Sequence, residues 1–221
     1  TKNQLDYNEY GLRAFTLNYP NFFDQIENKT GYGIWLHAIP PTKSLKRGSR
    51  GCLVVRNEAI EKVKKYVDLN KTHVIVEDKI DYSPQENILK NKKDFFKWLE
   101  QWKISWEGKQ ISNYMNFYHD LFKANKMNKL QWQEYKSNLN EKYNYINVKL
   151  YSPVVFQHKD EIIVRFLQRY ESDLNSDFGE KTLYVKKEAG QFKIIGEEWA
   201  PLSNNDMVAT YESTKCAIPG C

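Results

Sequence analysis

His37 and Cys52, fifteen positions apart, are the residues of this sequence with the clearest chemical potential. His37 ends the apolar run Ile-Trp-Leu-His, and Cys52 lies between a Gly-Ser-Arg-Gly segment and a β-rich Leu-Val-Val run. A thiol needs a neighbouring base before it acts as a nucleophile, and an imidazole is such a base. Gly51 indicates a backbone bend that turns the sulfur and nearby N–H groups toward one spot. We expect paired strands to hold both side chains, with residues 39–48 closing a hairpin-like connection.

These two residue types also have a purely structural interpretation. An isolated cysteine often packs as a small apolar side chain, and an isolated histidine is often a core residue with satisfied hydrogen bonds. Residue types alone do not choose between a core pair and a catalytic pair. The choice depends on the local sequence pattern.

That pattern, Ser-Arg-Gly-Cys-x-Val-x-x-Asn after Ile-Trp-Leu-His, resembles the L,D-transpeptidase (YkuD-like) catalytic domain of cell-wall enzymes. Residues 10–33 are similar to one branch of that family, the cell-shape-determining murein L,D-carboxypeptidases of helical Gram-negative bacteria. The resemblance covers residues 7 to about 80. The sequence departs from the family at Arg50, where a second histidine is common, and at Ala38, where glycine is usual.

The resemblance implies a site for acyl transfer through a thiol. Cys52 would attack the stem-peptide carbonyl between meso-diaminopimelate and the terminal D-alanine, and His37 would take the thiol proton. The main-chain carbonyl of Ala38 would orient the imidazole, and the N–H groups of Gly51 and Cys52 would bind the oxyanion. Water as acceptor makes the enzyme a carboxypeptidase, which the subfamily resemblance favours. An amine from a second stem peptide makes it a transpeptidase. No cofactor is implied.

Five further residues are candidates for contact with the substrate or for support of the site. A guanidinium binds a carboxylate through two hydrogen bonds, and of Arg50 and Arg56 the first is favoured, since Arg56 has the position of an exposed strand residue. Ser49 either braces the turn or touches substrate. Trp35 and Tyr32 either wall the cleft or pack in the core.

The composition sets limits on the class of protein. The 221 residues are 41% hydrophobic, which suits two small folded domains and excludes wholesale disorder. The net charge of +5 is spread along the chain, so no nucleic-acid partner is expected. No apolar run approaches twenty residues, so no integral membrane segment is predicted. The family resemblance implies a periplasmic location and peptidoglycan stem peptides as partners, with the signal segment and the N-terminal part of the catalytic domain absent from this chain.

The residue pattern predicts an α+β protein of two domains. We expect a β-rich catalytic domain over residues 1–80, a polar linker over 81–90, a second domain over 91–203 and a tail over 204–221. Within the first domain we expect a strand over residues 52–55 and a helix over 58–66 capped by Asn57. A buried strand is expected over residues 73–76, with His73 structural at its edge.

The second domain is expected to contain three helices followed by antiparallel strands. Aromatic residues recur at helical spacing from Phe95 to Trp106, Tyr118 falls in the expected second helix, and Trp132 lies in the third. Strands are expected over residues 148–151, 154–158, 162–170, 181–187 and 192–199. A curved sheet wrapping helices resembles the nuclear-transport-factor-2-like (NTF2-like) fold, which often encloses a pocket for a sugar or peptide. Aromatic residues at helical spacing more often form a core.

The remaining histidines and cysteines support few further roles. His119 and His158 have no partners at metal-ligand spacing, so no metal is expected. Cys216 and Cys221 either form a short-loop disulfide or remain free thiols. A non-catalytic peptidoglycan-binding module is the alternative to an enzyme.

Overall fold

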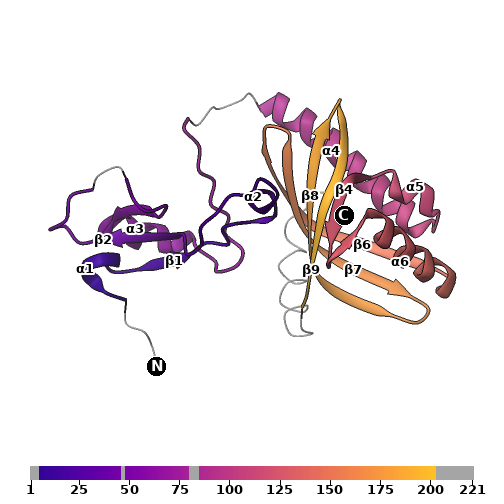
Figure 1. Cartoon of the computed structure of the whole chain (residues 1–221), viewed down its shortest axis with the longest axis horizontal. Helices are drawn as coiled ribbons and strands as arrows, with labels where there is room; N and C mark the ends of the chain where they lie inside the picture. The colour runs from indigo at the N-terminus through magenta and orange to yellow at the C-terminus, as the bar shows by residue number, and fades with distance from the viewer. Residues whose placement is uncertain (1–4, 46–47, 80–84, 203–221) are drawn as a thin grey trace. The chain divides into compact units, whose positions relative to one another are not determined.

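The computed structural model describes residues 5–45, 48–79 and 85–202, except for the side chains of residues 85–91. The chain divides into two compact units, Thr1–Tyr82 and Ser83–Cys221 (Figure 1). Each unit has its own β-sheet, with three strands in the first and six in the second. Both combine the sheet with helices, so the predicted two-domain α+β class is confirmed. Among the described helices, none has the length and apolarity needed to cross a membrane.

The first unit is built on a sheet with the strand order β1-β2-β3. Strand β1 runs antiparallel to β2, whereas β2 and β3 are parallel. The hairpin-like connection predicted between these two strands is therefore wrong. Parallel strands require the chain to return along the sheet between the end of β2 at Ile39 and the start of β3 at Leu53. The elements are α1 (Tyr7–Tyr10), β1 (Ala14–Thr16), α2 (Phe22–Ile26), β2 (Trp35–Ile39), β3 (Leu53–Arg56), α3 (Asn57–Val63) and the 3-10 helix η1 (Lys64–Tyr66).

Two other predictions for the first unit need correction. Asn57 is the first residue of α3 rather than its cap, and its buried amide accepts a hydrogen bond from the Leu12 N–H at 3.0 Å. The strand expected over residues 73–76 is an exposed coil, in which the Ile75 and Val76 side chains are 67% and 68% exposed. Branched side chains give a segment strand propensity, but a strand forms only where it finds a pairing partner.

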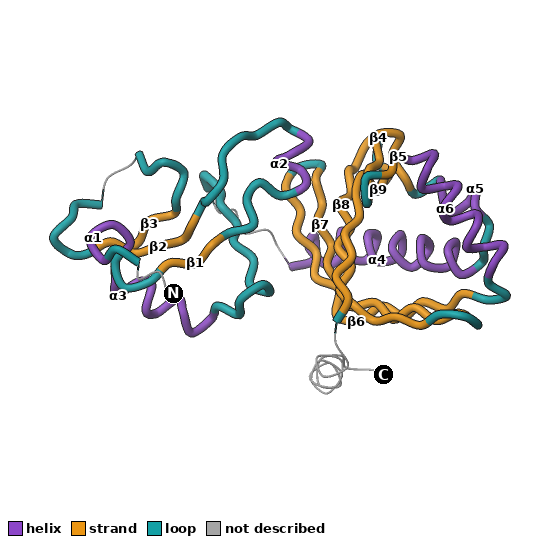
Figure 2. The backbone as a smooth tube through the Cα atoms, turned by 60° about the horizontal axis from the view of Figure 1, so that its bottom comes forward, coloured by secondary structure: helices purple, strands orange, loops and turns teal. Residues whose placement is uncertain are grey.

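The second unit places three helices against a curved six-stranded sheet of order β5-β4-β9-β8-β7-β6 (Figure 2). Its long strands pair antiparallel, while β4 joins β9 in parallel. The helices are α4 (Gln85–Glu107), α5 (Ile111–Met115) and α6 (Lys129–Lys142), and the strands are β4 (Tyr118–Ala124), β5 (Met127–Asn128), β6 (Ile146–His158), β7 (Glu161–Ser172), β8 (Ser176–Glu188) and β9 (Gln191–Pro201).

The aromatic residues of α4 form the core between the helices and the sheet. Trp102 is fully buried, and its ring centroid lies 5.6 Å from that of Trp106 and 6.2 Å from that of Phe166 on β7. The core interpretation of this aromatic pattern is therefore confirmed. The helix begins at Gln85, inside the segment predicted as linker, because polar residues with high helix propensity look alike in a linker and in a first helical turn.

The strand β4 was missed, and Tyr118 begins it instead of continuing a helix. Tyr118 and Phe122 are both buried, and a spacing of four positions puts two side chains on one face of a helix and equally on one face of a strand. This spacing alone therefore does not distinguish the two kinds of element. The predicted strands over residues 148–151 and 154–158 are one strand, β6, interrupted by a register shift, and the others are confirmed with longer bounds.

Candidate active site

Two parallel strands bring His37 and Cys52 to one region of the first sheet. In the pairing of β2 with β3, Leu36 lies opposite Leu53 and His37 opposite Val54. Cys52 directly precedes β3, so its Cα is expected roughly 8 Å from that of His37 by strand geometry. Side chains alternate along a strand, so a continuation of the β3 alternation through Cys52 would put its side chain on the face of Val54 and His37. We therefore expect the thiol and the imidazole to face one another across the strand pair.

His37 is a buried base with one ring nitrogen already engaged. Its side chain is 7% exposed, and Nδ1 lies 2.8 Å from the main-chain oxygen of Ala38. A carbonyl oxygen only accepts hydrogen bonds, so in the neutral ring Nδ1 carries the proton and donates it. Nε2 then keeps its lone pair. Alanine follows the histidine here, where glycine is usual in the family. The contact is made by the main-chain carbonyl, which both residues have, so the ring is oriented in the same way.

The turn before Cys52 is braced by Ser49. The Ser49 hydroxyl donates to the Cys52 carbonyl at 2.6 Å and accepts from the Gly51 N–H at 3.3 Å. Gly51 has a φ of 108°, and a Cβ at this position would lie 2.7 Å from Cδ1 of Ile34. The Cys52 sulfur is 3.9 Å from the Gly33 carbonyl oxygen. The turn therefore requires glycine, and the Gly51 N–H is engaged with Ser49.

The two candidate arginines have different surroundings. The Arg50 side chain is 94% exposed, and its guanidinium lies 3.3 Å from the carboxylate of Glu9. Arg56 donates to the main-chain oxygen of Lys43 at 2.6 Å and so holds the connection between β2 and β3. Arg50 is thus the guanidinium that is open to an incoming carboxylate.

Aromatic rings surround one side of the candidate base. Trp35 begins β2, and its ring centroid lies 5.0 Å from that of Tyr10, which in turn lies 5.2 Å from that of His37. The Tyr32 side chain is 92% exposed, which excludes the core alternative for that residue. Tyr10 was not predicted as part of the site, although it contacts the base directly.

Helix α1 carries Tyr10. It was not predicted from the sequence because it is only four residues long. Its signals are present: Asp6 caps the helix by accepting from the Asn8 N–H at 2.9 Å, and Gly11 ends it. Gly11 has a φ of 60°, and a Cβ there would lie 2.7 Å from the carbonyl carbon of Ala38 and 2.5 Å from the Asn57 side-chain oxygen. The helix end thus packs on the residue that orients the imidazole.

Gly11→Ala is expected to destabilise the first domain by about 1–3 kcal/mol, since the methyl group overlaps fixed backbone, and to lower activity because it displaces the Ala38 carbonyl. Gly48→Ala is the matched control, since Gly48 also has a positive φ, of 106°, but nothing lies within 4 Å of its Cβ position. Thermal unfolding of both variants measures the change in stability, and their rate of turnover measures the change in activity. Equal losses in the two variants would show that backbone strain, not the close approach, explains the glycine.

The second unit contains a buried polar cluster on the inner side of its sheet. The Lys181 ammonium lies 2.8 Å from the Glu197 carboxylate, and Tyr118 donates a hydrogen bond to the other oxygen of that carboxylate. Burial opposes the charge on Glu197, but the ammonium groups of Lys181 and Lys136 and these hydrogen bonds hold its pKa below the ordinary value. Burial raises the pKa of Tyr118 well above its ordinary value.

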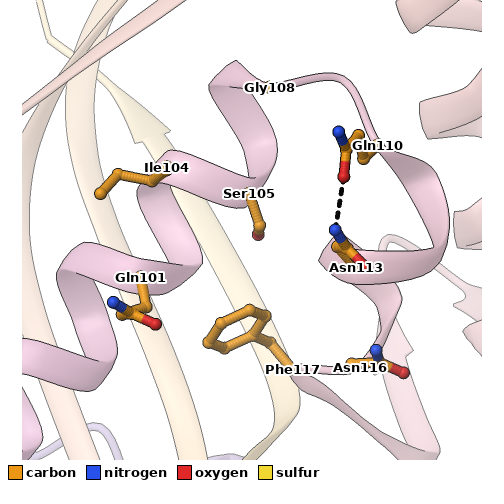
Figure 3. Close-up of a pocket in the computed structure, with 8 residues that line it drawn as sticks. All are labelled: Gln101, Ile104, Ser105, Gly108, Gln110, Asn113, Asn116 and Phe117. Atoms are coloured by element: carbon orange, nitrogen blue, oxygen red, sulfur yellow. Dashed lines mark hydrogen bonds between the residues drawn. The ribbon is translucent and has the colours of Figure 1, made fainter.

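The second unit also carries a surface cavity of about 440 Å³ where α4 meets α5 (Figure 3). Its lining is uncharged and differs from the aromatic core that the sequence suggested as a ligand pocket. Within the cavity, the Asn113 amide donates to the Gln110 side chain. The lining residues are Gln101, Ile104, Ser105, Gly108, Gln110, Asn113, Asn116 and Phe117.

The other histidines and cysteines add nothing to the candidate site. His119 lies on β4 with Nε2 3.2 Å from the Glu188 carboxylate. Within residues 5–45, 48–79 and 85–202, no group of three or more histidine, cysteine, aspartate or glutamate side chains is arranged for a metal ion. The alternatives for Cys216 and Cys221 concern residues outside the described part of the chain.

Comparisons with known proteins assign both domains. Residues 2–76 match the L,D-transpeptidase catalytic domain, and residues 94–198 match the Cds6 C-terminal NTF2-like domain. No curated protein sequence matches the chain. These matches confirm the resemblances that the sequence suggested for the Cys52 pattern and for the helix-and-sheet region.

Two solved structures share the two-domain architecture. Bd1075 of Bdellovibrio bacteriovorus is 46% identical with a TM-score of 0.85, over 92% of this chain and 74% of Bd1075. The helical cell shape determining protein Pgp2 of Campylobacter jejuni is 27% identical with a TM-score of 0.65, over 86% of this chain and 68% of Pgp2. The chain belongs to the family of proteins that join an L,D-transpeptidase catalytic domain to a Cds6-type NTF2-like domain. This family membership implies a peptidoglycan peptide as substrate and an extracytoplasmic location.

Proposed function

We propose that this protein is a cysteine-dependent murein L,D-carboxypeptidase that removes the terminal D-alanine from stem tetrapeptides in the periplasm. The observation that carries the proposal is the buried His37, whose Nδ1 is held 2.8 Å from the Ala38 carbonyl and whose Nε2 is left as the base. The proposal is supported by the parallel pairing of β2 and β3, because Cys52 directly precedes β3 and His37 lies on β2. The similarity to Pgp2, a helical cell shape determining protein, supports a role in shaping peptidoglycan.

The reaction proceeds in two acyl transfers. His37 Nε2 accepts the thiol proton as the Cys52 sulfur attacks the carbonyl carbon of the L-centre of diaminopimelate, forming a tetrahedral oxyanion. The imidazolium returns the proton to the amine of D-alanine, which leaves as the carbon–nitrogen bond breaks and a thioester remains. His37 then takes a proton from water, the hydroxide attacks the thioester, and the sulfur leaves and regains its proton.

The main chain of the turn supplies oxyanion donors. We assign this role to the Cys52 N–H, joined by the Gly51 N–H when its 3.3 Å hydrogen bond to Ser49 yields to the stronger acceptor. Loss of one such donor typically costs about 3–4 kcal/mol of transition-state stabilisation. We therefore propose that Ser49 braces the turn before Cys52 and does not itself contact the substrate.

Arg50 is the residue proposed to bind the carboxylate of the terminal D-alanine, because its exposed guanidinium offers a bidentate partner for a carboxylate. The carboxypeptidase and the transpeptidase both release this D-alanine from the same acyl donor, so the preference for water as the acceptor rests on the subfamily resemblance. The present partner of Arg50, Glu9, lies at 3.3 Å in an exposed ion pair, which is worth less than about 1 kcal/mol and yields readily to substrate. Trp35 is the aromatic residue of β2 proposed to wall the cleft, and the exposed Tyr32 is proposed to contact substrate at its rim.

Disaccharide tetrapeptide is incubated with the purified protein and with Cys52→Ala, and products are followed by mass spectrometry. We expect disaccharide tripeptide and free D-alanine from the wild type and no D-alanine from Cys52→Ala. The double variant Cys216→Ala/Cys221→Ala, which removes thiols elsewhere in the chain, is expected to keep full activity. Cross-linked dimers or exchanged D-amino acids would instead identify a transpeptidase. Binding of the tetrapeptide without turnover, by wild type and Cys52→Ala alike, would identify a binding module.

A further inference from the structure

We propose that Tyr10 is a positioning residue that fixes the orientation of the His37 imidazole, an inference that rests on the proposed thiol chemistry. The ring centroids of Tyr10 and His37 lie 5.2 Å apart with an interplanar angle of 71°, an edge-to-face contact. Tyr10 also packs at 5.0 Å against Trp35, two residues before His37 on the same face of β2. The tyrosine ring therefore lies against both aromatic side chains of this strand face.

The base needs this second constraint because one hydrogen bond does not fix a ring. The Nδ1 contact with the Ala38 carbonyl anchors one nitrogen at 2.8 Å but allows the imidazole to tilt about that anchor. A tilt moves Nε2, the atom that must meet the Cys52 thiol. An edge-to-face neighbour blocks the tilt, since aromatic pairs favour a narrow set of orientations.

Helix α1 is itself held firmly enough to act as such a support. The Tyr10 N–H donates to the Asp6 carbonyl at 2.8 Å, and the Gly11 N–H donates to the Tyr7 carbonyl at 2.9 Å. The Tyr7 hydroxyl accepts from the buried Asn57 amide at 3.2 Å, which ties α1 to α3. Tyr10 thus projects from a segment that is attached to the same strands and helix that carry the site.

The surroundings of the Tyr10 hydroxyl fit a positioning role and not that of a base. Burial and the neighbouring Glu9 raise the pKa of Tyr10, and the sulfur of Cys52 contributes in the same direction, while Arg50 opposes it. The hydroxyl therefore stays protonated at neutral pH. His37 is therefore the residue proposed to take the thiol proton. Tyr10 contributes through the contact of its ring with the imidazole and not through its hydroxyl.

The test compares Tyr10→Leu, which removes the ring, with Tyr10→Phe, which keeps it. One readout is kcat and KM for D-alanine release, and the other is the pH dependence of Cys52 alkylation by iodoacetamide. We expect Tyr10→Leu to lower kcat ten- to a hundredfold with KM changed less than about twofold, since a misplacement of about 1 Å can cost about 10²-fold. Its alkylation profile should move toward that of His37→Gln. Tyr10→Phe should restore both readouts to within about threefold of wild type.

Tyr66→Leu, the same kind of change at a tyrosine of the same domain that is 82% exposed, is the control and should keep the wild-type alkylation profile. A Tyr10→Leu variant with wild-type kcat and alkylation profile would overturn the proposal, as would equal losses in the leucine and phenylalanine variants. If the leucine variant unfolds, Tyr10→Met carries the same readouts with a side chain of similar volume that is longer and more adaptable. An ordinary thiol profile in the wild-type protein would instead refute the Cys52–His37 pair on which the inference rests.

Discussion

His37→Gln is expected to lower kcat/KM for D-alanine release at pH 7 by about 10²–10⁴-fold, the usual contribution of a general base. Glutamine has a similar reach but cannot take the thiol proton. An ordinary thiol loses its proton near pH 8.5, so part of the lost activity should return as the pH is raised from 7 to 9. The measurement is the pH dependence of kcat/KM, together with the alkylation rate of Cys52 over the same range.

His73→Gln is the matched control, since His73 belongs to the same domain but lies in the exposed coil that follows η1. It is expected to keep the wild-type pH profile. His37→Gln activity within threefold of wild type would contradict the assignment of His37 as the base. Loss of activity without any recovery at pH 9 would point to a collapsed site, which circular dichroism of the variant would detect.

The sequence pattern predicts thiol chemistry for this site, but it does not predict the topology that assembles the site. Apolar, β-rich runs indicate strands around His37 and Cys52, yet they carry no information about strand direction, so the parallel pairing of β2 with β3 was missed. The consequence is substantive, because parallel pairing puts Cys52 next to the start of β2 and not beside the end of a hairpin. The residue types at His37 and Cys52 are unaffected by that error.

The residues that surround His37 and Cys52 were harder to predict from the sequence than this pair of candidates. Asn57 has the residue type of a helix cap, but it is buried and hydrogen-bonds to Leu12 and Tyr7, which lie 45 and 50 positions earlier in the chain. Tyr10 lies 27 positions from His37, and no local spacing links the two. Such long-range contacts depend on how the strands are arranged, which a short motif does not encode.

In the NTF2-like domain, too, features set by local spacing could be predicted from the sequence, whereas features set by long-range contacts could not. The aromatic residues of α4 were correctly predicted as core because their spacing repeats within the helix. Lys136 of α6, by contrast, looked like any lysine on a polar helix. Its side chain is only 6% exposed, and its ammonium lies over the rings of Trp106 and Tyr114 on helices earlier in the chain.

Lys136→Met is expected to stabilise the second domain at pH 7 by about 1–2 kcal/mol, because a buried ammonium costs more than its contacts return. Its Nζ lies 4.0 Å from the Trp106 ring centroid and 4.8 Å from that of Trp132, which favours the charged form. Burial outweighs these contacts and the nearby Glu197 carboxylate, and lowers the pKa of Lys136 to about 7; the Lys181 charge acts in the same direction. Methionine keeps most of the volume without the charge.

The pH dependence gives the sharper test of the Lys136 prediction. Between pH 7 and about 10.5 the unfolded chain holds a proton on Lys136 that the folded domain releases, so folding stability should rise with pH by up to about 1.4 kcal/mol per unit. Below pH 7 both states carry the proton and the slope vanishes. The Lys136→Met variant should lack this rise. Denaturant unfolding at pH 7, 8, 9 and 10, followed by tryptophan fluorescence, measures it, since five of the six tryptophans lie in the second unit.

Other groups that face Lys136 do not account for such a rise. The carboxylates of Glu197 and Asp177 titrate at lower pH even though burial raises the pKa of Asp177, and Tyr114 has its pKa raised well above the ordinary value by burial. Lys142→Met, at an exposed position of the same helix, is the control and should follow the wild-type curve. Parallel curves for wild type and Lys136→Met would mean that Lys136 keeps its proton throughout. In that case the aromatic rings of Trp106 and Trp132 would be stabilising a buried ammonium, and the methionine variant should be the less stable protein.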